Sequence, residues 1–285
     1  MAAGLTVLGP LSRPRMTSRS HWPGQHLAAL SSAVRRHPIL AAFGAMVAVS
    51  LPFLLFPALD LAASRLFYAE ASGFSAATSS AIRTLRKVGV AVQILIALLV
   101  FLPLLVKLAF PESRLLVRPR TTLFVLATYA VGPGLIVNAL LKEHWGRARP
   151  RDVLEFGGTA DFTPVWHLSQ ACGTNCSFVS GEGASAFFVV ALVFIAPPAW
   201  RRVVLVGTLL FAAVVSYGRL AMGGHFLSDV LLSWAIVLVV MVVFWRLLLI
   251  GLPRGFDTSA EAALARAGRA LRRGLSGLRT DRPRL

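Results

Sequence analysis

Six long stretches without a charged residue constrain the fold of this chain more than any other feature. A helix that crosses a bilayer needs about 20 apolar residues. Four of the stretches hold 18 to 23 residues, and the last two hold 16 each. They lie between Arg36 and Asp60, Lys87 and Lys107, Arg120 and Lys142, Glu182 and Arg201, Arg202 and Arg219, and Asp229 and Arg246. The last two reach spanning length only if a charged residue at one helix end is tolerated, and such a residue calls for a functional explanation.

Composition supports an integral membrane protein. Hydrophobic residues make up 56% of the 285 residues, charged residues make up 14%, and the mean hydropathy is +0.71. These values exclude an ordinary soluble enzyme. The net charge of +17 could indicate a nucleic-acid partner, but a DNA-binding module does not carry so much apolar sequence. We therefore predict an all-α, polytopic membrane protein with six transmembrane helices over residues 38–252, bound by membrane lipids, with no nucleic-acid partner and no obligate protein partner.

Basic residues predict the orientation. Residues 1–37 contain five arginines, and no small-residue cleavage site follows the first apolar run, so we interpret them as a cytoplasmic tail. With this end inside, 20 of the 29 Lys and Arg residues are cytoplasmic and nine face outward, as the positive-inside rule requires. The prediction is a membrane protein with both tails in the cytoplasm and a long loop over residues 142–183 on the outer side.

The basic C-terminal tail, residues 253–285, has two interpretations. Thr258 and Glu261 have the spacing of a capping box, and leucines then alternate with arginines. This pattern predicts an amphipathic helix on the anionic inner leaflet. A solvated, partly disordered tail is the alternative.

The two cysteines, Cys172 and Cys176, lie in the outer loop. In an oxidising compartment we expect a local disulfide between them. A metal site is the weaker alternative because His167 is the only nearby histidine, and a buried free thiol pair is the other.

Polar residues cluster at three places, all on the predicted outer side. After the third stretch, Lys142 and Arg149 supply two cations of the kinds that bind phosphate oxygens. Juxtamembrane cations more often meet lipid headgroups, so this cluster alone is a weak signal. Before the fourth stretch, Ser180 and Gly181 precede a predicted helix, where a hydroxyl and free amides form an anion site. Helix capping is the simpler interpretation of Ser180, but it does not explain Glu182.

The third cluster joins the fifth and sixth stretches. Arg219 is followed by His225 and Asp229, and the latter two are four residues apart. If a helix starts near His225, the carboxylate can hold one imidazole nitrogen while the other faces a reacting centre. A proton relay in a lipid or anion transporter is the rival interpretation, and it predicts transport without phosphate release.

In this order, the K-x6-R-P, Ser-Gly-acid and R-x5-H-x3-D elements resemble the type 2 phosphatidic acid phosphatase superfamily of membrane phosphatases. The flanking residues are similar to those of bacterial lipid A 4'-phosphatases. They include Gly132-Pro-Gly, Arg149-Pro-Arg151, Cys172-x3-Cys176-Ser-Phe-Val and Gly223-Gly-His-Phe. The resemblance covers roughly residues 37–250.

The resemblance implies a role for each matching residue. His225 is the nucleophile that forms a phosphohistidine, and Asp229 orients it. The phosphoryl oxygens are held by Lys142, Arg149, Ser180, Gly181 and Arg219. No metal and no cofactor are implied. Glu182 stands where the broad superfamily has histidine and Gly218 where it has serine, so the general acid is in question; Glu182 is a catalytic candidate as an acid or by positioning.

The predicted function is hydrolysis of a lipid phosphate monoester, with the 4'-phosphate of lipid A as the expected substrate. The alternative substrates are undecaprenyl diphosphate, phosphatidylglycerol phosphate and lipid A 1-phosphate. A diphosphate would explain a weak acid at Glu182, since phosphate leaves without help.

Overall fold

The computed structural model describes residue 32 and residues 34–280, with the side chains of residues 275–280 left out. The described residues form helices and loops, with no β-strand beyond two isolated bridges, so the prediction of an all-α chain is confirmed. The basic tail predicted at residues 1–37 lies almost entirely outside the described residues.

Five helices are long and apolar enough to cross a membrane. Their bounds are α2, Pro38–Leu55; α4, Ser80–Ala109; α5 with η2 and α6, Pro119–His144; α9, Arg201–Ala221; and α10 with η6, Leu227–Ile250. The middle of the third helix, η2 (Ala130–Leu141), and the end of the fifth, η6 (Trp245–Ile250), have π-helical hydrogen bonding. Pro133 lies inside η2 and cannot donate a backbone hydrogen bond, which disturbs the regular α-helical ladder there.

The fourth apolar stretch forms a shorter helix than the other five. It consists of α7 (Gly181–Phe188), η5 (Val189–Ala191) and α8 (Leu192–Ile195) and has 15 residues, so the structure shows five spanning candidates and one short helix instead of six full spans. All residues of α7 except Glu182 are buried, and α7 packs against α4, α9, α10 and η2. Glycine, alanine and serine in α7 permit this close approach, because small side chains let helix backbones lie near one another.

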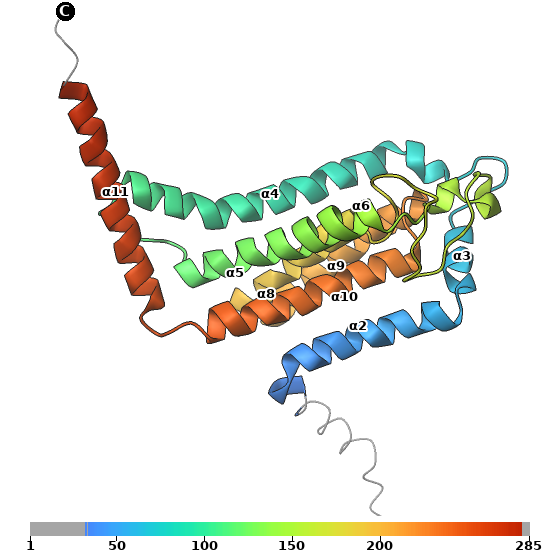
Figure 1. Ribbon diagram of the computed structural model, residues 1–285, viewed down its shortest axis with the longest axis horizontal. Helices are drawn as coiled ribbons and strands as arrows, with labels where there is room; N and C mark the ends of the chain where they lie inside the picture. Colours follow the sequence, from blue (N-terminus) through green and yellow to red (C-terminus); the bar gives the residue numbers. More distant parts are fainter. Residues whose placement is uncertain (1–31, 33, 281–285) are drawn as a thin grey trace, which may run out of the picture. The chain divides into compact units, whose positions relative to one another are not determined.

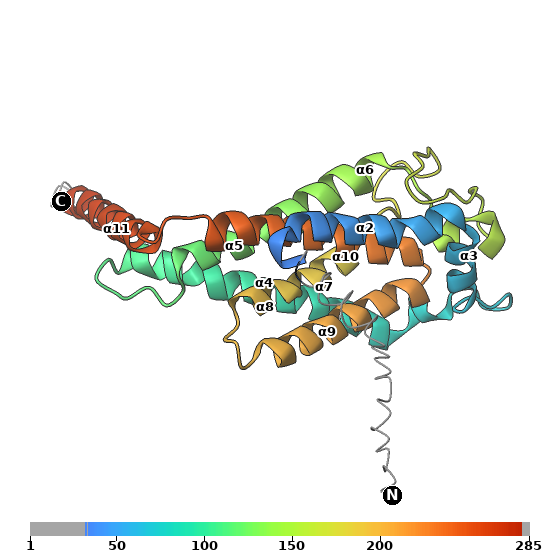
Figure 2. The same ribbon diagram turned by 90° about the horizontal axis from the view of Figure 1, so that it is seen from below.

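The remaining elements lie at the two ends of the bundle (Figures 1 and 2). One end carries α3 (Ala58–Arg65), η1 (Ser75–Thr78) and the loop after α6 (Lys142–His144), which includes the short turns η3 (Pro150–Asp152) and η4 (Leu154–Phe156). A small apolar cluster of Phe74, Val153, Phe156 and Phe226 packs beneath this loop.

At the other end, α11 (Phe256–Thr280) crosses the ends of α4 and α5. The C-terminal tail is therefore helical to Thr280, as the amphipathic interpretation predicted. The expected capping box does not form, because the helix begins at Phe256 and Glu261 pairs with Lys107 at 3.1 Å. Asp257 likewise pairs with Arg120 at 2.7 Å, so α11 is attached to the bundle by ion pairs as well as by its apolar face.

Candidate active site

The three polar clusters meet at one end of the helices, as the sequence predicted. Lys142 lies at the end of the third helix, Ser180 caps the start of α7, Arg219 lies in the last turn of α9, and His225 immediately precedes α10. Adjacent helices run in opposite directions, so the end of one helix and the start of the next lie at the same end of the bundle (Figure 1). The three clusters stand at such helix ends and are thereby brought together.

His225 is the centre of this cluster and is fully buried in its loop. Its Nδ1 lies 2.7 Å from the carbonyl oxygen of Ser177. A carbonyl oxygen can only accept, so Nδ1 carries the proton and Nε2 presents its lone pair. Nε2 is buried without a hydrogen-bond partner among the described residues. The imidazole is therefore held through Nδ1, and its Nε2 is left without a protein partner among the described residues.

The electrostatic surroundings keep this imidazole neutral. Burial lowers the pKa of His225 well below its ordinary value of 6.5, and Arg219, Lys142 and Arg149 lower it further, in that order. The same three cations are the predicted phosphate-binding residues. They favour an anion beside His225 and disfavour a proton on it.

Asp229 lies beside His225, but no hydrogen bond joins the two side chains. Because α10 begins at Leu227, His225 lies outside the helix, and its Nδ1 is 4.0 Å from Oδ2 of Asp229. Oδ2 instead accepts hydrogen bonds from the Ser177 hydroxyl (2.5 Å) and the Phe226 amide (2.9 Å). Asp229 therefore acts on His225 indirectly. It holds the Phe226 amide, next to His225 in the chain, and the hydroxyl of Ser177, whose carbonyl accepts from His225.

A buried arginine joins Asp229 to a second carboxylate. Arg147 donates to Asp229 Oδ1 at 2.6 Å, to Asp60 Oδ2 at 2.8 Å and to the Ser228 hydroxyl at 2.9 Å. Its guanidinium also lies 4.4 Å from the centre of the Phe226 ring. Asp60 further accepts from the amide of Ser228 at 2.8 Å. This network ties the start of α3, the loop after α6 and the start of α10 together.

Sequence reasoning missed Arg147 and Asp60. Asp60 was visible as a charge at the edge of an apolar stretch, where a charge needs a partner, whereas Arg147 lies within the polar loop and gave no such signal. The contact between them spans 87 positions, so no local spacing could indicate it.

Ser180 and Gly181 form the start of α7. The Ser180 hydroxyl accepts from the Gly183 amide at 3.1 Å, which is the capping role, and the Ser180 amide donates to the Asp229 carbonyl at 3.1 Å. A Cβ on Gly181 would lie 2.4 Å from Oδ1 of Asn138, so a larger residue does not fit without movement of that side chain. The start of α7, where free amides form the positive end of the helix dipole, consequently stays close to Lys142. Lys142 and Gly181 line the same cavity of about 160 Å³.

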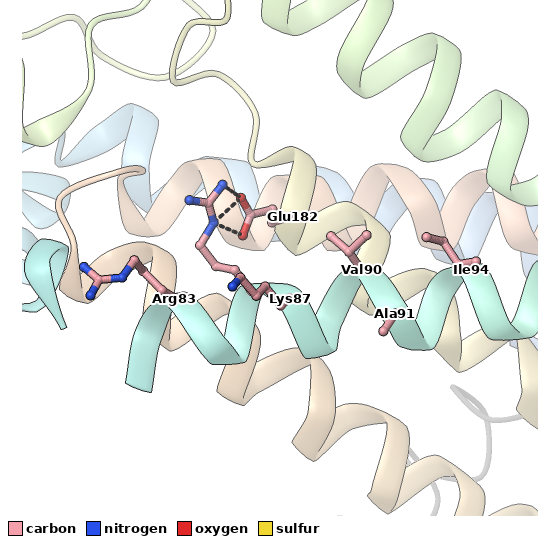
Figure 3. Close-up of a pocket in the computed structure, with 7 residues that line it drawn as sticks. Arg83, Lys87, Val90, Ala91, Ile94 and Glu182 are labelled. Carbon is pink, nitrogen blue, oxygen red and sulfur yellow. Dashed lines mark hydrogen bonds and ion pairs between the residues drawn. The ribbon is translucent and has the colours of Figure 1, made fainter. Parts of the chain in front are cut away.

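Glu182 is paired with two guanidinium groups. Its Oε1 atom lies 2.8 Å from Arg86 Nη2 and 3.3 Å from Arg219 Nη1. Arg86 Nε donates to both carboxylate oxygens, as the dashed lines at Glu182 in Figure 3 show. Arg219 also donates to the sulfur of Met222, and its Nε is buried without a partner among the described residues. Glu182 thus holds Arg219, and Arg86 is a further residue that sequence reasoning missed.

The outer loop brings the last candidates to the site. The structure links Cys172 to Cys176 by a disulfide with an S–S distance of 2.17 Å. Within that ring, the carbonyl oxygen of Asn175 accepts from Arg149 Nη2. The bridge therefore lies one hydrogen bond from a predicted phosphate-binding residue. Among the described residues, no group of three or more His, Cys, Asp and Glu side chains is placed to hold a metal ion.

Known proteins match the part of the chain that carries this site. The model of the PAP2 superfamily matches residues 121–249. A lipid A 4'-phosphatase of Francisella tularensis subsp. novicida is 35% identical over 184 residues, which cover 62% of this chain and 81% of the relative. The chain belongs to the PAP2 superfamily. The predicted resemblance is thereby confirmed, and the apolar helices identify a multi-pass bacterial membrane protein.

Other PAP2 relatives match over a shorter region. Lipid A 4'-phosphatases of Rhizobium leguminosarum and Rhizobium etli are 44% and 42% identical over 115 residues, or 40% of this chain. The chain spans about half the length of these two relatives, 49% and 45% respectively. No solved structure matches the chain significantly.

Proposed function

We propose that this PAP2 protein is a lipid phosphate phosphatase that removes a phosphate monoester, the 4'-phosphate of lipid A, at the periplasmic face of the bacterial inner membrane. The observation that carries the proposal is the free, buried Nε2 of a neutral His225 beside three cations. The names of the relatives supply the substrate.

The reaction proceeds in two steps. Nε2 of His225 attacks phosphorus, the bond to the sugar oxygen breaks, and that oxygen takes a proton from water. Water then attacks the phosphohistidine and releases inorganic phosphate and the free imidazole. Lys142, Arg149, Arg219 and the Gly181 amide hold the phosphoryl oxygens as charge shifts onto them.

Nδ1 remains bonded to the Ser177 carbonyl throughout, so the positive charge on the phosphorylated ring is stabilised by that oxygen. Asp229 fixes the Ser177 hydroxyl and is itself fixed by Arg147. The role of Asp229 is therefore to position Ser177, whose carbonyl in turn positions the imidazole of His225.

Glu182 favours a second candidate substrate. Its carboxyl oxygens face Arg86 and Arg219, a geometry that suits positioning of Arg219 better than transfer of a proton to a leaving group. A diphosphate, whose leaving group needs no proton, fits such a site, and undecaprenyl diphosphate is the second candidate.

The test is phosphate release from purified protein in phosphatidylcholine vesicles. We expect release of inorganic phosphate from lipid A, with mass spectrometry showing loss of the phosphate at the 4' position. His225→Ala should abolish release, whereas His167→Ala, which alters an exposed histidine of the outer loop, should not. A base-quenched reaction should show a phosphorylated wild-type protein and an unmodified His225→Ala variant.

Other outcomes separate the alternatives. Release from undecaprenyl diphosphate but not from lipid A would assign the second substrate. Release of phosphate by His225→Ala at the wild-type rate would reject the phosphohistidine. Movement of lipid across the vesicle without any phosphate release would favour a transporter.

A further inference from the structure

A groove runs along α4 beside the smaller cavity that Lys142 and Gly181 line (Figure 3). Its volume is about 460 Å³, and one turn after another of α4 lines it. The outer end is cationic, with Arg83, Arg86 and Lys87, and the part further along the helix is apolar, with Val90, Ala91 and Ile94. These positions share one helix face because residues three and four apart are neighbours on a helix surface.

The groove adjoins the cavity that two of the proposed phosphate-binding residues, Lys142 and Gly181, line. Arg86, Val90 and Glu182 line both the groove and the smaller cavity that Lys142 and Gly181 also line. Glu182 in turn contacts Arg219. A molecule in the groove therefore reaches the phosphate-binding residues without crossing the bundle.

The charges in the groove are only partly used by the protein. Glu182 is the acidic residue that lines it, and this carboxylate pairs with Arg86. Arg83 donates to the neutral carbonyl of Thr78 at 2.7 Å, which leaves its charge uncompensated. Lys87 has no hydrogen-bond or ion-pair partner among the described residues. Two exposed cations four positions apart thus lie beside a site that already has its own phosphate-binding set.

The apolar part of the groove is open towards the surroundings of the bundle. Val90 is 49% exposed and Ile94 is 55% exposed, on a helix apolar enough to span a membrane. Lipid chains are the surroundings of such a face. An amphiphile with an anionic group above an acyl chain is complementary to both parts of the groove at once.

We propose that this groove binds the lipid substrate laterally, with an acyl chain on Val90, Ala91 and Ile94 and a second phosphate, distinct from the one removed, on Arg83 and Lys87. The proposal rests on the proposed function and specifies its substrate class: a lipid that carries two phosphates. The enzyme then selects bisphosphorylated over monophosphorylated lipid by a contact remote from the reacting atoms.

The test compares two lipids and measures kcat/KM in phosphatidylcholine vesicles, which carry no net charge. One lipid A carries both phosphates, and the other carries only the 4'-phosphate. We expect the wild-type protein to prefer the first by roughly ten- to hundred-fold, the range for one charge-assisted hydrogen bond. The Arg83→Gln/Lys87→Gln variant should lose this preference and hydrolyse the monophosphorylated lipid as the wild type does. Arg65→Gln, an exposed arginine of α3 outside the groove, should keep the preference.

A second pair of variants tests the acyl-chain part. Ala91→Trp fills the groove and should raise KM for lipid A while leaving hydrolysis of p-nitrophenyl phosphate unchanged. Leu98→Trp places the same side chain on an exposed position of α4 outside the groove and should raise neither.

Two results would overturn the proposal. The first is an equal loss on both lipids in the Arg83→Gln/Lys87→Gln variant, which would indicate general attraction to anionic lipid. The second is lipid A hydrolysis at the wild-type KM by Ala91→Trp. If neither lipid A were hydrolysed by the wild type, the proposed function itself would fail, and this inference with it; hydrolysis of both at one rate would reject only the inference.

Discussion

Nη1 of Arg147 donates a 2.6 Å hydrogen bond to Oδ1 of Asp229, and neither side chain is exposed. The same guanidinium reaches Asp60 from its other nitrogen. One guanidinium thus lies between two buried carboxyl groups, and Ser177, Phe226 and Ser228 donate further hydrogen bonds to these carboxyl groups. The cluster makes the position of His225 depend on residues that never meet the substrate.

Arg147→Gln should destabilise the protein strongly. Removal of one member of a buried ion pair leaves an uncompensated buried charge and typically costs about 3–5 kcal/mol. We expect a lower midpoint of thermal unfolding in detergent together with reduced phosphatase activity. Arg151→Gln removes an exposed arginine of the same loop and should change the midpoint little. An unchanged midpoint for Arg147→Gln would contradict the role assigned to the network.

Ser177→Ala should lower activity without abolishing it. The substitution removes the hydroxyl that donates to Asp229 but keeps the carbonyl that accepts from His225. Loss of one hydrogen bond to a charged group corresponds to about 1.5–3 kcal/mol, or roughly ten- to hundred-fold in kcat/KM. Ser169→Ala is the control, because it removes the hydroxyl of a half-buried serine of the same loop that accepts from Thr163 and from the Ala171 amide. A loss as large as that of His225→Ala would mean that the hydroxyl takes part in the chemistry directly.

Glu182→Gln tests positioning against acid catalysis. If Glu182 positions Arg219, lipid A and p-nitrophenyl phosphate should lose kcat/KM by the same factor, because both need Arg219. If it donates a proton, lipid A should suffer more, by on the order of 10²- to 10⁴-fold, since the aryl leaving group needs no proton. The ion pairs with Arg86 and Arg219 predict equal losses. A selective loss on lipid A would restore the general-acid role.

The pH dependence should show a neutral His225. Its pKa lies well below 6.5 in the folded protein because burial and three cations disfavour the proton. Its nucleophilic form therefore persists as the pH falls through 6.5, and the acidic limb of kcat/KM due to this residue lies below that pH. The unfolded chain binds the proton first, so His225 also lowers stability as the pH falls below 6.5. An acidic limb at or above pH 6.5, unchanged in His167→Ala, would contradict this assignment.

The orientation of the site can be tested by labelling. Asp161→Cys places a thiol in the exposed outer loop, and an impermeant thiol reagent should modify it in intact spheroplasts. Arg114→Cys lies in the exposed connection at the other end of the bundle and should react only after the membrane is broken. The opposite result would place the site on the cytoplasmic side.

The sequence allowed prediction of the residues that lie at helix ends. Lys142, Ser180, Arg219 and His225 each stand next to an apolar stretch, and the alternation of helix direction places them together. The spacing of His225 and Asp229 predicts that the two lie close together, and they are 4.0 Å apart, but it does not predict that Nδ1 of His225 donates to the Ser177 carbonyl, because α10 begins at Leu227. Helix starts are not determined by spacing alone.

The missed residues are joined by contacts between distant segments. Arg86 and Glu182 are 96 positions apart, and Arg147 and Asp229 are 82 apart. The first pair can be predicted only if the packing of α4 against α7 is known. The second can be predicted only if the contact between the loop after α6 and α10 is known. The pattern of apolar residues in a single sequence indicates which face of a helix is buried. It does not indicate which other helix packs against that face.

The short helix over Gly181–Ile195 has a consequence for the membrane around the protein. Its 15 residues span about 22 Å, against about 30 Å for the hydrocarbon core. If its far end reaches the opposite boundary, the Ser180 end lies several ångströms below the headgroup plane, or the bilayer thins there. In either case the substrate phosphate must enter the protein below the headgroup plane to be hydrolysed. We expect the amount of water at that depth, rather than contact with bulk solvent, to control hydrolysis of the phosphorylated enzyme.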